Sequence, residues 1–172
     1  ALERRVKEKL SLAVSLGQPV DGKVVRAIER LRGARVLLAE DNPFNQMVTR
    51  KTLSKLDVTA DIAENGAVAL EMLDQTGYDL VFMDIRMPVM DGYEATRQIR
   101  ARGDDVARVP ILAITAEATE KARAQCLEAG MDGYLAKPVR IDKIVAAIDH
   151  CLAGAPVPAV AELPQPETVG AS

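Results

Sequence analysis

Short apolar runs alternate with amphipathic helical patterns from residue 35 to residue 153, and the alternation repeats five times. The runs have the length of strands, and three of them are almost wholly apolar, which is typical of parallel strands buried on both faces. The pattern therefore predicts an α/β fold, a doubly wound five-stranded parallel sheet with flanking helices. The predicted strands are Val36–Ala39, Thr59–Ala63, Leu80–Met83, Ile111–Ile114 and Gly133–Ala136.

Helical periodicity occupies the intervals between these runs and follows the last of them. The clearest stripe includes Ile144 and Ile148, with charged residues on the opposite side. Local signals agree, because Asn42 and Pro43 form a capping residue followed by a first-turn proline, and Gly130 follows the fourth helix. The predicted helices are Pro43–Leu56, Ala67–Gln75, Tyr93–Arg102, Thr119–Ala129 and Ile141–Leu152.

Two flanking segments differ from this central domain, which we assign to residues 34–153. Residues 1–33 contain two apolar stripes separated by a Gly-Gln-Pro break, and we expect a short helical N-terminal extension or linker. It could pack on the domain, pair between protomers, or belong to a domain further upstream. Residues 154–172 contain four prolines and no basic residue, a composition that predicts a disordered tail.

Charge is distributed unevenly along the chain. Residues 1–35 carry nine basic and four acidic side chains, whereas residues 36–153 carry 13 basic and 19 acidic ones. The acidic central domain argues against nucleic-acid binding. No apolar run approaches the roughly 18 residues that cross a bilayer, and no secretory signal is present, so we expect a cytoplasmic segment without membrane contact.

Polar residues follow the predicted strands at the points where these end. Glu40 and Asp41 follow the first strand, Asp84 the third, Thr115 the fourth and Lys137 the fifth. In an open parallel sheet the carboxyl ends of the strands share one edge, where ligands bind. Three crowded carboxylates repel one another unless a hard divalent cation neutralises them, which makes Mg²⁺ the natural cofactor.

The same set of residues suits phosphoryl transfer. A carboxylate can act as a nucleophile on phosphorus, and catalysis then consists mostly of in-line positioning and neutralisation of charge. A cation, the ammonium of Lys137 and the hydroxyl of Thr115 fit those tasks.

Four motifs closely resemble the receiver domain of two-component response regulators, over about residues 35–153. They are the Leu-Ala-Glu-Asp-Asn run at 38–42, the Met-Asp-Ile-Arg-Met-Pro-Val-Met-Asp-Gly run at 83–92, Thr115-Ala116 and Lys137-Pro138. The resemblance implies a flavodoxin-like receiver fold and a phosphoacceptor domain in a phosphorelay. Such a domain takes a phosphoryl group from a phosphohistidine, switches conformation and signals to a protein partner. It catalyses only its own phosphorylation and dephosphorylation.

The resemblance also implies roles for single residues. Asp84 corresponds to the phosphoacceptor, and Asp41, Asp84 and the backbone carbonyl of Arg86 to direct Mg²⁺ ligands. Glu40, where the family more often has aspartate, is expected to act through a metal-bound water. The exposed side chains of Arg86 and Glu117, each two residues past a key position, are expected to control water attack on the aspartyl phosphate.

Further implied roles concern the phosphoryl oxygens and the switch. Lys137 is expected to pair with these oxygens, and a cis peptide bond is expected before Pro138. The resemblance implies that the hydroxyl of Thr115 binds a phosphoryl oxygen and moves inward, and that Tyr134 rotates into the space it leaves.

The resemblance implies two kinds of partner. A histidine kinase or a histidine phosphotransfer protein is expected to dock around residues 43–56, and output partners around residues 119–152. Nothing between residue 153 and residue 172 resembles a helix-turn-helix or a catalytic domain, although an output domain could follow the tail in a longer parent protein. Two versions of the receiver interpretation remain, a stand-alone receiver and the receiver of a hybrid sensor histidine kinase with a possible kinase core in cis. The Ala-Glu-Asp-Asn-Pro run at 39–43 and the lack of an initial Met favour the hybrid kinase.

Two other classes compete with the receiver interpretation. Haloacid-dehalogenase-like phosphatases need a second aspartate two residues after the nucleophile, where this chain has Arg86. Flavodoxin-like flavin binders need a phosphate loop that Glu40 and Asp41 would repel. A phosphate-independent protein-binding module is the remaining alternative.

Overall fold

The computed structural model describes residues 33–152, with side chains up to residue 148. The expected helical extension before residue 33 and the expected tail after residue 153 lie outside the described residues. Within the described range no helix is both long and apolar enough to span a bilayer.

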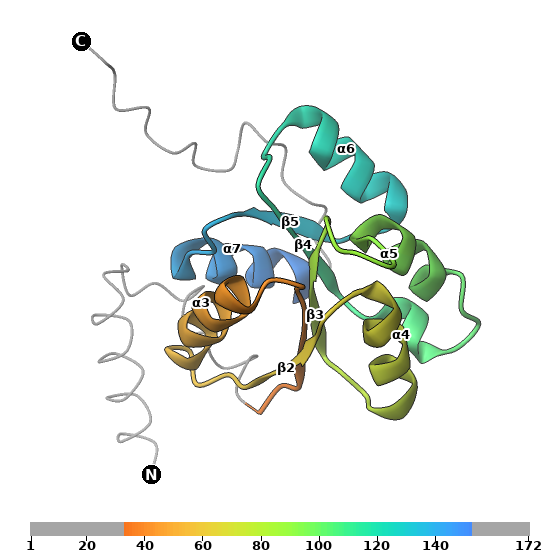
Figure 1. Cartoon of the computed structure of the whole chain (residues 1–172), viewed down its shortest axis with the longest axis horizontal. Helices are drawn as coiled ribbons and strands as arrows, with labels where there is room; N and C mark the ends of the chain where they lie inside the picture. Colours follow the sequence, from red (N-terminus) through yellow and green to blue (C-terminus); the bar gives the residue numbers. More distant parts are fainter. Residues whose placement is uncertain (1–32, 153–172) are drawn as a thin grey trace.

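Five parallel strands form one sheet in the order β2-β1-β3-β4-β5 (Figure 1). The predicted fold class is confirmed. Strands β3 and β4 each extend one residue further than predicted, so that Asp84 and Thr115 belong to the sheet itself. The strands are β1 (Val36–Ala39), β2 (Ala60–Ala63), β3 (Leu80–Asp84), β4 (Ile111–Thr115) and β5 (Gly133–Ala136).

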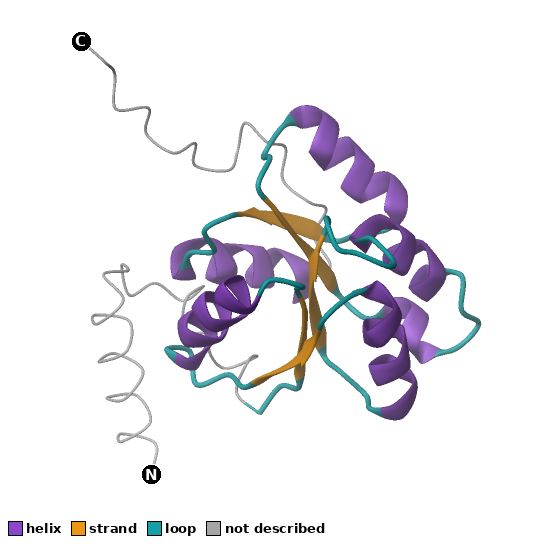
Figure 2. Cartoon of the chain, in the orientation of Figure 1, coloured by secondary structure: helices purple, strands orange, loops and turns teal. Residues whose placement is uncertain are grey.

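Helices cover both faces of the sheet, as Figure 2 shows. Helices α3 and α7 lie on one face and α4, α5 and α6 on the other (Figure 1). A short 3₁₀ turn, η1, precedes β4 and was not predicted from the sequence. The bounds are α3 (Pro43–Ser54), α4 (Gly66–Gln75), α5 (Gly92–Arg100), η1 (Asp105–Arg108), α6 (Glu120–Ala129) and α7 (Ile141–Leu152).

The central strands are buried on both faces because each alternates its side chains between two apolar clusters. In β1, Val36 and Leu38 face the cluster under α3 and α7, while Leu37 and Ala39 face the cluster under α4, α5 and α6. All four are at most 1% exposed. The sheet is therefore packed on both sides, and only its edges and strand ends can hold polar groups.

The side chain of Asn42 starts α3 by accepting hydrogen bonds from the backbone N–H groups of Phe44 and Asn45, at 2.9 and 3.2 Å. This cap, with Pro43 in the first turn, fixes where the helix begins. The first turn of α3 consequently lies directly beside the end of β1.

The segment after Asp84 folds back tightly on the end of β3. Gly92 donates its N–H to the carbonyl of Ile85 at 2.9 Å, and a Cβ at this glycine would lie only 2.3 Å from the carbonyl oxygen of Asp84. A side chain at position 92 would push the backbone of Asp84 out of place. The close approach therefore requires glycine and fixes the backbone of that residue.

Candidate functional site

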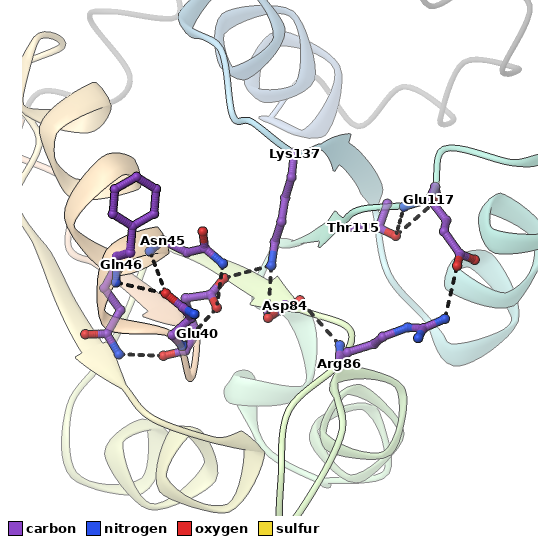
Figure 3. Close-up of polar contacts among 10 residues, drawn as sticks. Glu40, Asn45, Gln46, Asp84, Arg86, Thr115, Glu117 and Lys137 are labelled. Carbon is purple, nitrogen blue, oxygen red and sulfur yellow. Dashed lines mark hydrogen bonds and ion pairs between the residues drawn. The ribbon is translucent and has the colours of Figure 1, made fainter.

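Acidic and basic side chains from three strand ends meet at the carboxyl edge of the sheet (Figure 3). Glu40 follows β1, Asp84 ends β3 and Lys137 follows β5. The Nζ atom of Lys137 lies 3.1 Å from Oε2 of Glu40 and 3.2 Å from Oδ2 of Asp84. The ammonium thus sits between two buried carboxylates, as expected from the strand ends.

The carboxylates of Glu40, Asp41 and Asp84 form an acidic cluster in which one oxygen from each residue lies within 4.8 Å of the other two. Glu40 and Asp84 are buried, whereas Asp41 is exposed and leaves the cluster open to solvent. Within residues 33–148 this is the one group of side chains with metal-ligand spacing. Oxygen ligands of this kind suit a hard divalent cation, so the cluster fits a metal site.

Glu40 is held in place through every oxygen it has. Its Oε1 accepts hydrogen bonds from the N–H of Asn42 at 3.1 Å and from Nδ2 of Asn45 at 3.4 Å, while Oε2 faces Lys137. Its backbone carbonyl accepts a hydrogen bond from Nε2 of Gln46 at 2.7 Å. Burial by itself would raise the pKa of Glu40, but the Asn42 hydrogen bond and Lys137 lower it below its usual value.

Asp84 has the opposite shift. Burial raises its pKa to about 6, and the negative charge of Glu40 adds to the rise, while Lys137 offsets part of it. Lys137 itself keeps its charge, because the two carboxylates raise its pKa although burial acts to lower it. The folded protein therefore contains a carboxylate at the end of β3 that is unfavourably charged at neutral pH.

Thr115 reaches the same edge, but its hydroxyl bonds to the following loop. The Oγ1 atom accepts a hydrogen bond from the N–H of Glu117 at 3.0 Å and donates one to the Glu117 carbonyl at 3.1 Å. The side chain of Glu117 in turn forms an exposed ion pair with Arg86, at 3.1 Å. The backbone N–H of Arg86 donates to Oδ1 of Asp84 at 3.3 Å.

The remaining predicted features lie on β5 or directly after it. Tyr134 is 6% exposed and packs in the cluster under α4, α5 and α6, where burial raises its pKa. The Lys137–Pro138 peptide bond is cis, as expected. Sequence reasoning did not find the contacts of Asn45 and Gln46 with Glu40. The signal that could have found them is their position in the first helical turn after the acidic pair.

A family model for the response regulator receiver domain matches residues 36–149 of the chain. The chain belongs to this family. The match favours the receiver interpretation over the phosphatase alternative, and the receiver accounts for the whole sheet and all five of its flanking helices.

Solved receiver structures resemble this receiver along nearly their whole length. One of them is the receiver domain of a sensor histidine kinase from Pseudomonas aeruginosa, which has a magnesium ion coordinated in its active-site cleft. It is 40% identical to this chain, and the match has a TM-score of 0.63 and covers 70% of this chain and 98% of that one. The receiver domain of the response regulator Ssk1 of Saccharomyces cerevisiae, crystallised with the phosphotransfer protein Ypd1, is 32% identical, with a TM-score of 0.61 over 69% and 88%.

Curated relatives are long histidine kinases. Histidine kinase 5 of Arabidopsis thaliana is 36% identical in an alignment of 143 positions that covers 69% of this chain and 16% of the relative. Hybrid signal transduction histidine kinase K of Dictyostelium discoideum is 34% identical in an alignment of 124 positions that covers 69% of this chain and 10% of the relative. The receiver thus spans a small part of each of these proteins.

Replacement of Asp84 should stabilise the cation-free receiver. Because the folded-state pKa of about 6 lies above the usual value, the stability that this group contributes is present at low pH and is lost as pH rises through about 6. At pH 8 without divalent cations, Asp84→Asn removes this penalty. We expect it to raise the free energy of unfolding by about 1–3 kcal/mol, measured by urea denaturation.

The exposed Asp105, in η1, provides a matched control. Asp105→Asn should change the free energy of unfolding by less than about 0.5 kcal/mol. An Asp84→Asn protein less stable than wild type under these conditions would contradict the electrostatic account.

Proposed function

We propose that this receiver accepts a phosphoryl group from a phosphohistidine on Asp84 and signals to a protein partner by changing shape. The observation that carries the proposal is the position of the Asp84 carboxylate, within the acidic cluster and 3.2 Å from the ammonium of Lys137. An oxygen of Asp84 forms the new P–O bond while the P–N bond of the donor breaks. The imidazole leaves with the bonding electron pair and takes up a proton.

We propose Mg²⁺ as the cation, with Asp41, Asp84 and the backbone carbonyl of Arg86 as direct ligands and Glu40 acting through a water. When bound, the cation neutralises negative charge on the cluster and on the phosphoryl oxygens. The relative from Pseudomonas aeruginosa, which has magnesium in its cleft, supports this choice.

Lys137 supplies a fixed positive charge for the phosphoryl group. Its ammonium lies within hydrogen-bond distance of Asp84 before any phosphoryl group arrives, and Glu40 keeps it in that position. The charge therefore needs little rearrangement to pair with a phosphoryl oxygen as the P–O bond forms, and such preorganisation is the main source of catalysis in this chemistry.

Thr115 and Tyr134 are the proposed switch residues. To bind a phosphoryl oxygen, the hydroxyl of Thr115 has to give up its two hydrogen bonds to Glu117. That exchange frees the loop before α6 and moves the hydroxyl of Thr115 inward, and Tyr134 on the adjacent strand then rotates into the space that Thr115 leaves. The exposed Arg86–Glu117 ion pair joins the loops on either side of the phosphoacceptor, so we also assign it to control of water access.

The proposed phosphodonor is a histidine kinase or a histidine phosphotransfer protein that docks on α3. Phe44 and Met47 on this helix are 66% and 58% exposed, although both are large and apolar. A pocket of about 250 Å³ is lined by Phe44, Glu40, Lys137 and Pro138, among others. An apolar surface that reaches the acidic cluster fits a protein partner that must bring its histidine to Asp84.

We further propose that the receiver is part of a hybrid histidine kinase, with the kinase core in cis. The curated kinases from Arabidopsis thaliana and Dictyostelium discoideum support this assignment. A kinase of this kind draws on ATP, which makes the cytoplasm the proposed compartment.

The phosphoacceptor claim is tested by intact-mass measurement after incubation with acetyl phosphate. We expect a Mg²⁺-dependent gain of one phosphoryl group in wild type and none in Asp84→Asn. Absence of the adduct in wild type, under conditions that label a control receiver, would leave the phosphate-independent binding module as the better account.

Docking on α3 is tested by comparing two donors. Because Phe44 is exposed and lies outside the acidic cluster, Phe44→Ala should slow phosphotransfer from a phosphorylated histidine phosphotransfer protein about 10-fold, the effect of losing roughly 1.4 kcal/mol of contact. Phosphorylation by acetyl phosphate should stay unchanged.

Leu127→Ala is the matched control, since Leu127 is also an exposed apolar residue but lies on α6. Its transfer rates from both donors should equal those of wild type. Equal slowing by Phe44→Ala and Leu127→Ala, or slowing with acetyl phosphate as well, would argue against a docking role for α3.

A further inference from the structure

Gln46 makes a contact that the proposed phosphoryl transfer does not use. From the first turn of α3, its side-chain Nε2 reaches back to the backbone carbonyl of Glu40, at 2.7 Å (Figure 3). This contact is shorter than the other hydrogen bonds that Glu40 accepts, which measure 3.1 and 3.4 Å.

The carbonyl in question belongs to the peptide bond that joins Glu40 to Asp41. Because a peptide unit is planar, the direction of this carbonyl also sets the direction in which the chain enters Asp41. The N–H of Glu40 is already held by the carbonyl of Ala63 at 3.0 Å, and the N–H of Asn42 is held by the Glu40 side chain at 3.1 Å. Gln46 fixes the one peptide plane between these two points.

The direction of the Asp41 carboxylate depends on the orientation of this peptide plane more than the directions of the other carboxylates of the acidic cluster do. Glu40 and Asp84 are buried and both contact Lys137, so packing and charge hold their carboxylates. Asp41 is exposed, and no packing fixes where its carboxylate points. Its backbone direction is therefore the main constraint on its side chain.

We propose that Gln46 is a positioning residue for the divalent cation, which it serves by orienting the Glu40–Asp41 peptide so that the Asp41 carboxylate faces the other acids. Cation sites lose affinity when the groups that orient their ligands are removed, typically by 10–100-fold. Gln46 thereby sets how much Mg²⁺ the receiver needs. This inference rests on the cation-binding part of the proposed function and not on phosphoryl transfer.

Mg²⁺ binding measured by isothermal titration calorimetry, with no phosphodonor present, tests the proposal. Gln46→Met keeps the length of the side chain and its helix propensity but removes the donor. We expect the Mg²⁺ dissociation constant of this variant to rise about 10-fold over wild type. Thermal melting of the cation-free proteins checks that both are folded at the titration temperature.

Gln98→Met is the matched control. Gln98 is also a helical glutamine that donates one side-chain hydrogen bond, at 3.0 Å, but its acceptor is Glu94 on the same exposed surface of α5. Its Mg²⁺ affinity should equal that of wild type. Gln46→Asn keeps the amide but shortens the side chain by one carbon, and it should also weaken Mg²⁺ binding. This variant replaces Gln46→Met in the test if Gln46→Met does not fold.

Unchanged Mg²⁺ affinity in the folded Gln46 variants would overturn the proposal, even if their stability fell, because the hydrogen bond would then only stabilise the turn between β1 and α3. Absence of Mg²⁺ binding to wild type would overturn it too, together with the cation site. Weakened binding in the Gln46 variants would support it, even if wild type failed to accept a phosphoryl group from acetyl phosphate. In that case the phosphoacceptor claim alone would fail.

Discussion

Two buried carboxylates share one ammonium at the carboxyl edge of the sheet, and much of the receiver serves to keep these charges together. Glu40 and Asp84 are 1% and 3% exposed, so both have lost most of their hydration. Lys137 compensates part of that loss from 3.1 and 3.2 Å. The compensation is incomplete, because the pKa of Asp84 still rises to about 6. A site with surplus negative charge that is open at Asp41 is suited to attract a cation.

The parallel arrangement of the strands produces this surplus of negative charge. All five strands are parallel, so their carboxyl ends meet at one edge, and the apolar layers on both faces leave the polar groups of the central strands only the strand ends. Short contacts then fix the backbone near the site. Gly92 packs against the carbonyl of Asp84, and Asn42 caps α3 directly after the acidic pair. These backbone contacts thus hold the acidic side chains close together although their negative charges repel one another.

The sequence predicts the sheet and the acidic cluster well because both follow from strong, local patterns. Buried parallel strands have continuous apolar runs, and a polar residue at the end of such a run is easily seen, as with Asp84 and Lys137. The turn η1 was missed because its four residues carry no apolar period. The bonds of Thr115 to Glu117 and of Gln46 to Glu40 depend on rotamers and loop paths, which tertiary packing decides.

The central claim is that Asp84 carries the phosphoryl group. Reduction of the phosphorylated receiver with sodium borohydride converts an aspartyl phosphate to homoserine, and peptide mass spectrometry then locates the modified residue. The account predicts homoserine at position 84 alone, and only in protein phosphorylated in the presence of Mg²⁺. Homoserine at position 41, or a phosphoryl group that survives reduction on another residue, would contradict it.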